Sequence, residues 1–193
     1  MKGKITTGNV LYVLIMVIVL VMLINPTAKS LLIRGLMSIG FFQPDIPAQV
    51  SKKPIADPFN ISFRNAGGQL INTADLNGKI VFVNFWATWC PPCIAEMPSV
   101  NQLYEQFKND PNIVFIVADV DNDHIKAEEF MQKHHYDLPV FNLTSQVPDY
   151  IMDGSIPTTL VFNKRGELVF RHTGAANYNS SDFYNYLNKL INE

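Results

Sequence analysis

The sequence predicts an α/β fold, in which a mixed sheet is covered by helices and preceded by one transmembrane helix. Two nearly continuous apolar runs, Ile80–Trp86 and residues 112–120, are rich in β-branched and aromatic residues, as are strands buried on both faces. Segments with helical signals stand between the predicted strands. Near the N-terminus, the 24 residues 5–28 carry no charge. A helix of that length can cross ~30 Å of hydrocarbon.

Composition and charge exclude several classes of protein. The formal net charge of −2 provides no long-range attraction for nucleic acid, so no such partner is expected. Two cysteines cannot build a multi-bridge disulfide scaffold or a four-cysteine zinc site. The charge is also uneven, with +3 on residues 1–50 and −5 on the remainder. This division predicts a basic membrane end and an acidic soluble domain.

Residues 1–28 are expected to form a cytoplasmic tip and a signal-anchor transmembrane helix. Fifteen apolar residues, 10–24, are followed by Asn25-Pro26, which should end the helix. Cleavage after Ala28 would place Pro26 where a signal peptidase needs a small residue. An uncleaved anchor is therefore favoured, with cleavage as the alternative. The basic tip favours a cytoplasmic N-terminus, although Lys29 and Arg34 follow the span.

Residues 29–58 are expected to form a membrane-proximal segment and a proline-rich linker. Leu32, Leu36 and Ile39 share one face at helical spacing. This pattern favours a membrane-surface helix within 31–42, and a segment packed on the folded domain is the alternative. Four prolines, at 44, 47, 54 and 58, predict that residues 43–58 are extended.

Residues 59–193 are expected to form the folded domain. Residues 61–64 and 69–71 flank Ala66-Gly67-Gly68, which predicts a hairpin ahead of the strand Ile80–Trp86. A helix should open at Pro91-Pro92, because proline is tolerated in the first turn, and run to about residue 109 with a kink at Pro98. The elements expected next are a strand at 112–120, a helix at 123–135 and a strand at 138–142.

The last part of the domain should contain a hairpin and a closing helix. Strands are predicted at 158–162 and 167–172, with the turn at Lys164-Arg165-Gly166. The closing helix, 180–192, has Ser180 or Ser181 available as its N-cap. A further helix is expected between the strands at 138–142 and 158–162.

Both cysteines lie in Trp89-Cys90-Pro91-Pro92-Cys93, directly after a buried strand and at the opening of a helix. The N–H groups and positive dipole end of a helix N-terminus stabilise a thiolate, so the pKa of Cys90 can fall well below ~8.5. The two-residue spacing lets Cys93 reach back and close a small ring. The pattern therefore predicts a redox-active pair.

The residues around the two cysteines exclude a haem site and a peroxiredoxin site. A c-type haem would need His after Cys93, where Ile94 stands, and a peroxiredoxin would need Thr at the position of Ala87. Two alternatives remain open at this point. One is a redox-inert interaction module, and the other is a copper or zinc carrier that pairs the cysteines with one of the four histidines: His124, His134, His135 or His172.

Residues 85–93 (FWATWCPPC), Glu96-Met97-Pro98 and Ile156-Pro157-Thr158-Thr159 resemble the membrane-anchored TlpA-like (ResA-like) branch of the thioredoxin superfamily. The resemblance covers roughly residues 59–192. It implies a thioredoxin-like fold with an N-terminal hairpin and a central insert near residues 136–151. It also implies a thiol–disulfide oxidoreductase that needs no cofactor or metal.

The same resemblance implies partners and location. Proteins of this branch exchange disulfides with extracytoplasmic protein dithiols and disulfides, often in cytochrome c maturation, and a membrane redox partner supplies or accepts the electrons. The expected location is the bacterial inner membrane, crossed once, with the C-terminal domain facing the periplasm or extracytoplasmic space.

The resemblance also assigns roles to individual residues. Cys90 is the expected nucleophile and Cys93 the resolving thiol, and together they form the redox disulfide. Glu96 would change how readily the resolving thiol loses its proton. Pro157 would be a cis-proline facing the cysteines, leaving the Ile156 backbone free to pair with an extended partner peptide.

Two tryptophans and one asparagine complete the expectations. Trp89 should shape the docking face, whereas Trp86 belongs either to that face or to the core. Asn84 stands six residues before Cys90, where cytoplasmic thioredoxins usually carry a buried Asp. A neutral amide cannot transfer a proton, so Glu96 or water must do so.

Overall fold

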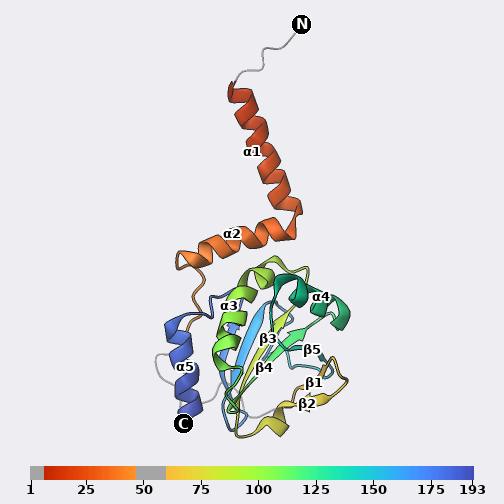
Figure 1. Cartoon of the computed structure of the whole chain (residues 1–193), viewed down its shortest axis with the longest axis vertical. Coiled ribbons are helices and arrows are strands. Elements are labelled where there is room, and N and C mark those ends of the chain that lie inside the picture. The colour runs from red at the N-terminus through yellow and green to blue at the C-terminus, as the bar shows by residue number, and fades with distance from the viewer. Residues whose placement is uncertain (1–6, 47–59) are drawn as a thin grey trace.

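A computed structural model describes residues 7–46 and 60–193, and it contains a mixed sheet with helices packed on it (Figure 1). Within the described residues the sheet has seven strands in the order β2-β1-β5-β4-β3-β6-β7. β3 is an interior strand, parallel to β4 and antiparallel to β6. The strands are β1 (Ser62–Asn65), β2 (Leu70–Asn72), β3 (Ile80–Trp86), β4 (Ile113–Asp119), β5 (Val140–Leu143), β6 (Thr158–Phe162) and β7 (Leu168–Thr173).

Helices α3, α4 and α5 begin and end within two residues of the predicted positions. The helix expected over residues 31–42 lies instead at 26–38 and packs on the folded domain, which was the alternative prediction for that segment. α3 opens at Pro91, as proline in the first turn predicts, and α5 is capped by Ser180, whose hydroxyl accepts from the Phe183 N–H. A short 3₁₀ helix, η1 (Thr73–Leu76), was not predicted. The α-helices are α1 (Thr7–Ile24), α2 (Pro26–Ser38), α3 (Pro91–Phe107), α4 (His124–His134) and α5 (Ser181–Asn192).

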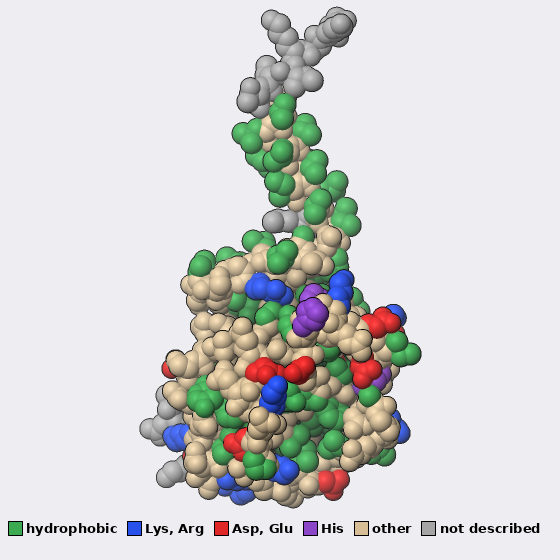
Figure 2. All heavy atoms as spheres, in the orientation of Figure 1, with side chains coloured by type: hydrophobic (Ala, Val, Ile, Leu, Met, Phe, Trp, Pro, Cys, Tyr) green, Lys and Arg blue, Asp and Glu red, His purple; other side chains and the backbone are tan. Residues whose placement is uncertain are grey.

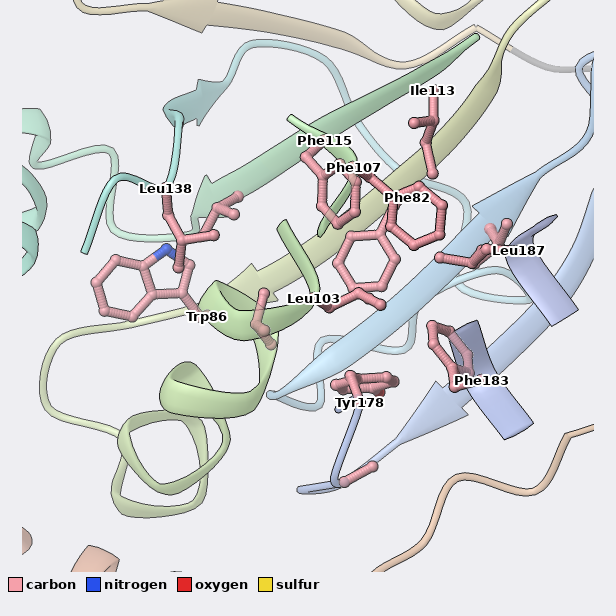
Figure 3. Packing of buried hydrophobic residues seen from close by; sticks show 14 of the residues in the cluster. Phe82, Trp86, Leu103, Phe107, Ile113, Phe115, Leu138, Tyr178, Phe183 and Leu187 are labelled. Carbon is pink, nitrogen blue, oxygen red and sulfur yellow. The ribbon is translucent and has the colours of Figure 1, made fainter. Parts of the chain in front are cut away.

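The core lies on both faces of β3, whose seven residues are all buried. On one face Phe82 packs against Phe115, Tyr178 and Phe183, with ring centroids 4.9, 5.7 and 6.3 Å away (Figure 3). Helices α3, α4 and α5 all contribute to this cluster. The alternate β3 residues pack on the other face. The prediction of a strand buried on both sides is therefore confirmed.

The helix expected between β5 and β6 is absent, and that prediction was wrong. Residues 144–157 form turns instead, and the N–H groups of Ile151 and Met152 both donate to the Pro148 carbonyl. Pro148 and Pro157, together with Gly154 at a positive φ of 84°, interrupt any regular helix in this segment. The segment still covers the sheet, because Ile151 is fully buried in the second cluster.

The N-terminal part consists of two helices joined at a sharp bend. Asn25 caps α2, its side-chain oxygen accepting from the Thr27 N–H at 2.9 Å, so the predicted break at Asn25-Pro26 is present. Among the described residues no single helix is long and apolar enough to cross a membrane. The pair Gly8–Val21 and Pro26–Ser38 passes that test jointly, with a bend of 97° between its members.

The chain after α2 runs along the domain as far as the described residues extend. Pro44 is buried and Ile46 packs against the larger core cluster. Residues 47–58 of the predicted linker lie outside the described residues. The proposed division into residues 1–28, 29–58 and 59–193 stays a prediction.

Candidate active site

The cysteine pair lies at the corner between β3 and α3. Cys90 is the N-cap of α3, and its sulfur accepts from the Cys93 N–H at 3.3 Å. Pro91 and Pro92 have no N–H, so the Cys93 N–H is the first backbone donor that this helix offers. Cys90 and Cys93 are disulfide-bonded, with Cα atoms 5.3 Å apart. Both sulfurs are therefore positioned at a helix N-terminus, as predicted.

The two cysteines differ in exposure. Cys90 keeps 3% of its surface accessible, whereas Cys93 keeps none. The neighbouring Trp89 is 58% exposed. A macromolecule that approaches this corner therefore meets Trp89 and the edge of Cys90, while Cys93 stays behind them.

The segment before β6 faces the disulfide. The Ile156–Pro157 peptide bond is cis, as the resemblance implies. Strand β6 pairs with β3 with Thr158 opposite Phe85, which brings Pro157 to the end of β3 from which the cysteine corner starts. The Cys90 sulfur lies 3.8 Å from the Ile156 carbonyl oxygen. The structure thus places Ile156 and Pro157 beside Cys90.

Glu96 is fully buried one helical turn after Cys93. Its Oε1 accepts from the Asn84 amide at 2.7 Å, and its Oε2 accepts from the Ala176 N–H at 3.1 Å. Burial raises the pKa of Glu96 to about 8, although both hydrogen bonds act in the opposite direction. The carboxyl group therefore changes its charge near neutral pH, where an unperturbed glutamate is already ionised.

The polar cluster around Glu96 includes Thr159 and Tyr178, for which the sequence predicted no such role. The Asn84 amide also donates to Thr159 Oγ1 at 2.9 Å. Tyr178 is fully buried, and its pKa is raised by burial and by the nearby charge of Glu96. Asn84 and Thr159 are opposite each other in the β3–β6 register. The hydrogen bond between Asn84 and Thr159 could therefore be predicted only from the register of β3 and β6.

The Trp89 side chain is hydrogen-bonded to a carboxylate in the segment that follows strand β4. Its indole N–H donates to Asp121 Oδ2 at 2.6 Å, just beyond the end of β4. The sequence alone did not indicate this partner, although carboxyl ends of adjacent parallel strands meet at one edge of a sheet. Trp86, by contrast, is fully buried with its ring 5.1 Å from Phe130, so it belongs to the core.

The alternative prediction of a copper or zinc carrier required at least one of the four histidines to lie beside the cysteines. Within residues 7–46 and 60–193, no group of three or more His, Cys, Asp or Glu side chains is placed to hold a metal ion. The ring of His134 instead lies 4.4 Å from the ring of Phe130.

Comparison with known proteins identifies the family. The Redoxin family model matches residues 52–187. A thiol-disulfide oxidoreductase ResA of Bacillus cereus is 32% identical over 136 residues, covering 70% of this chain and 76% of that protein. ResA of Bacillus subtilis is also 32% identical, covering 70% and 74%.

A solved structure supports the fold. A putative thiol:disulfide interchange protein DsbE from Chlorobium tepidum superposes with a TM-score of 0.60 at 19% identity, covering 73% of this chain and 99% of that one. The fold, the disulfide at a helix N-terminus and the sequence matches agree. The chain belongs to the Redoxin family and, within the thioredoxin superfamily, to the ResA/TlpA-like thiol–disulfide oxidoreductases.

Proposed function

We propose that this oxidoreductase is anchored in the bacterial inner membrane and exchanges the Cys90–Cys93 disulfide with extracytoplasmic protein partners. The observation that carries the exchange chemistry is the position of the Cys90 sulfur. It accepts from the Cys93 N–H at 3.3 Å, lies 3.8 Å from the Ile156 carbonyl oxygen and adjoins the exposed Trp89. Cys93 has no exposed surface and acts only after Cys90.

The exchange has two steps. The Cys90 thiolate attacks one sulfur of a partner disulfide, a Cys90–partner bond forms, and the other partner sulfur leaves as a thiolate. The Cys93 thiolate then attacks the Cys90 sulfur, the Cys90–Cys93 bond forms, and the second partner sulfur leaves. Two electrons pass from the protein's dithiol to the partner. Run in reverse, the same steps oxidise a partner dithiol.

Glu96 supplies proton transfer for the resolving step. Cys93 must lose its proton before it attacks, and Asn84, a neutral amide, cannot accept it. The buried Glu96 carboxyl has a pKa of about 8 and lies one helical turn away, so it exchanges a proton near neutral pH at little cost. Its hydrogen bonds to Asn84 and Ala176 keep it oriented in both steps.

Partner docking uses the surface around Cys90. Trp89, next to it in the chain, offers an exposed aromatic ring, and the Ile156 carbonyl oxygen lies 3.8 Å from the Cys90 sulfur. A partner peptide in extended conformation pairs with the Ile156 backbone by β-addition and presents its cysteine to Cys90.

The membrane placement rests on the N-terminal sequence. Residues 5–28 carry no charge, and every side chain from 10 to 21 is exposed in α1. A membrane redox partner would supply or accept the electrons, and the cysteines of apocytochrome c are the proposed clients by family resemblance. A reporter enzyme fused after Glu193 tests the topology: activity confined to the cytoplasm would contradict the proposal.

Insulin reduction by the full chain in detergent, with dithiothreitol as the electron source, tests the chemistry. Wild-type protein should accelerate the reaction, and Cys90→Ser should abolish the acceleration. A disulfide-bonded peptide carrying a CxxCH motif should also be reduced, faster than the same peptide with both flanks scrambled. Equal rates on the two peptides would argue against apocytochrome c as the client.

A further inference from the structure

Helix α2 is packed on the redox domain immediately beside the cysteine corner. Met37 is buried against Ala95 and Ala175, with Ile33 next to them. The Arg34 guanidinium donates to the Ile94 carbonyl at 3.3 Å. Ile94 and Ala95 directly follow Cys93, so α2 covers the flank of the first turns of α3.

The chain after α2 is also attached to the domain. The Asn177 N–H donates to the Phe42 carbonyl at 2.9 Å. Phe42 adopts a φ of 62°, a left-handed conformation that is unfavourable for a phenylalanine and is retained here by its surroundings. Helix α2 therefore moves with the domain rather than hanging from it.

The face of α2 turned away from the domain is apolar. At about 100° per residue, Ala28, Leu31, Leu32 and Gly35 lie opposite the buried Ser30 and Met37. Leu31 and Leu32 are 58% and 51% exposed. A helix on the surface of a globular protein normally carries polar residues on this face. Of the two cations of α2, Lys29 is exposed at one border of the apolar face, whereas Arg34 is turned toward the domain, where its guanidinium donates to the Ile94 carbonyl.

The apolar surface continues beyond the helix in both directions. After α2, Ile39 and Phe41 are 70% and 59% exposed. Before it, α1 leaves on the side opposite the domain, at a bend of 97° (Figure 1). Apolar side chains surround α1 and are also visible on α2 (Figure 2). If α1 runs along the bilayer normal, α2 lies in the bilayer plane with its apolar face toward the lipid.

We propose that α2 is an interfacial helix that docks the redox domain on the lipid surface, with Leu31 and Leu32 in the headgroup region and the cysteine corner beneath. Lys29, at the border of the face, meets anionic headgroups. One helix diameter, about 10 Å, then separates the corner from the lipid. The partners that reach Cys90 are accordingly dithiols or disulfides held close to the membrane surface. This inference rests on the anchoring by α1 proposed above.

Tryptophan depth measurements test the position of α2. Full-length Leu32→Trp is reconstituted in vesicles of phosphatidylcholine and phosphatidylglycerol that contain lipids brominated near the headgroup end of the acyl chain. Leu70→Trp on β2 is the matched control, since Leu70 is 58% exposed against 51% for Leu32 but lies on the sheet edge far from α2 (Figure 1). Fluorescence of wild-type protein is subtracted to remove Trp86 and Trp89. Bromolipid should quench the tryptophan at 32 at least twofold more than the one at 70.

The outcomes separate this inference from the anchoring proposal. Release of the protein from vesicles by alkaline carbonate would overturn the anchor and the inference with it. Retention with equal quenching at positions 32 and 70 would overturn the role of α2 alone. Cross-linked dimers without quenching would assign the face to a second copy of the chain, and would also overturn it.

A second variant tests the consequence for partners. Leu31→Ser/Leu32→Ser should retain the wild-type rate toward a soluble disulfide peptide. Toward the same peptide coupled to a lipid in the vesicle, its rate should fall several-fold, because the corner is no longer held at the surface. Leu70→Ser should match wild type on both substrates. Equal rates of the double variant and wild type on the tethered peptide would contradict the proposal.

Discussion

The amide of Asn84 on β3 donates to the carboxyl of Glu96 on α3 at 2.7 Å, and neither side chain has any exposed surface. Strand β3 and the active-site helix α3 are therefore joined by a buried polar pair one helical turn after Cys93. Because the carboxyl has no exposed surface, its protonation is coupled to folding.

Glu96 should make the protein less stable as the pH rises. The pKa of its carboxyl is about 8 in the folded protein against 4.5 as the model value, so the folded state favours the protonated form. The corresponding stability is fully present below pH 4.5 and is lost as the pH rises through about 8. At about 1.4 kcal/mol for each unit of pKa, the loss is on the order of several kcal/mol.

Urea unfolding of oxidised wild type and Glu96→Gln between these pH values measures this effect. The difference in unfolding free energy between the two proteins should shift steadily in favour of the glutamine variant. His134 and His172, whose pKa values are lowered by burial, contribute to both proteins and cancel in the difference. A difference that stays constant with pH would contradict the buried titration of Glu96.

A second carboxyl at position 84 should couple with Glu96. In Asn84→Asp two buried carboxyl groups in contact would share one proton, since both cannot be ionised there. The variant should lose more stability at pH 8 than at pH 5, by at least about 1 kcal/mol. Asn84→Asp/Glu96→Gln should recover much of the loss by restoring an amide–carboxyl pair. The prediction fails if Asn84→Asp costs the same at both pH values.

Cys93→Ser should trap partners on Cys90. Without the resolving thiol, the mixed disulfide formed in the first step persists. Non-reducing gels and mass spectrometry of a reaction with insulin should show the adduct for Cys93→Ser and none for Cys90→Ser. The chain has only these two cysteines, so each variant has a single attachment point. Comparable adducts in both variants would mean that the buried Cys93 is accessible.

Asp121 should act as a positioning residue for Trp89. Asp121→Ala removes the acceptor of the indole N–H, so the exposed ring becomes free to change orientation. We expect a several-fold rise in KM for a protein disulfide, with kcat and the rate toward a small aromatic disulfide unchanged. Asp182→Ala, in the first turn of α5, is the control for loss of one surface carboxylate. A fall in kcat on both substrates would indicate a different role.

Phe82 should be critical for stability, because its ring joins β3 to β4 and α5. Phe82→Ala should cost about 3–5 kcal/mol of unfolding free energy, through lost burial and the cavity left behind. Leu70→Ala, at an exposed edge, should change it by no more than about 0.5 kcal/mol. Urea unfolding of the full chain in detergent measures both, and similar costs would contradict the packing described for β3.

The elements that the sequence predicted well are those with strong local signals. Strand β3 matches its prediction at both ends, because six of its seven residues are apolar and favour strands, and the two prolines start α3 where they stand. The wrongly expected helix before β6 was supported by its place in the element order and by the resemblance, which implied an insert near residues 136–151, but by no local signal. Pro148 and Gly154, local signals against a helix, decided the outcome.

The sequence by itself determined the chemistry of this protein: two cysteines at the start of a helix, because their spacing and the helix dipole act over a few adjacent residues. Only the tertiary structure decided which groups surround that chemistry. Glu96 meets Asn84 and Ala176, Trp89 meets Asp121, and α2 meets the first turns of α3. These partners are separated by between 12 and 80 residues, or lie on separate helices, so strand register and helix packing bring them together.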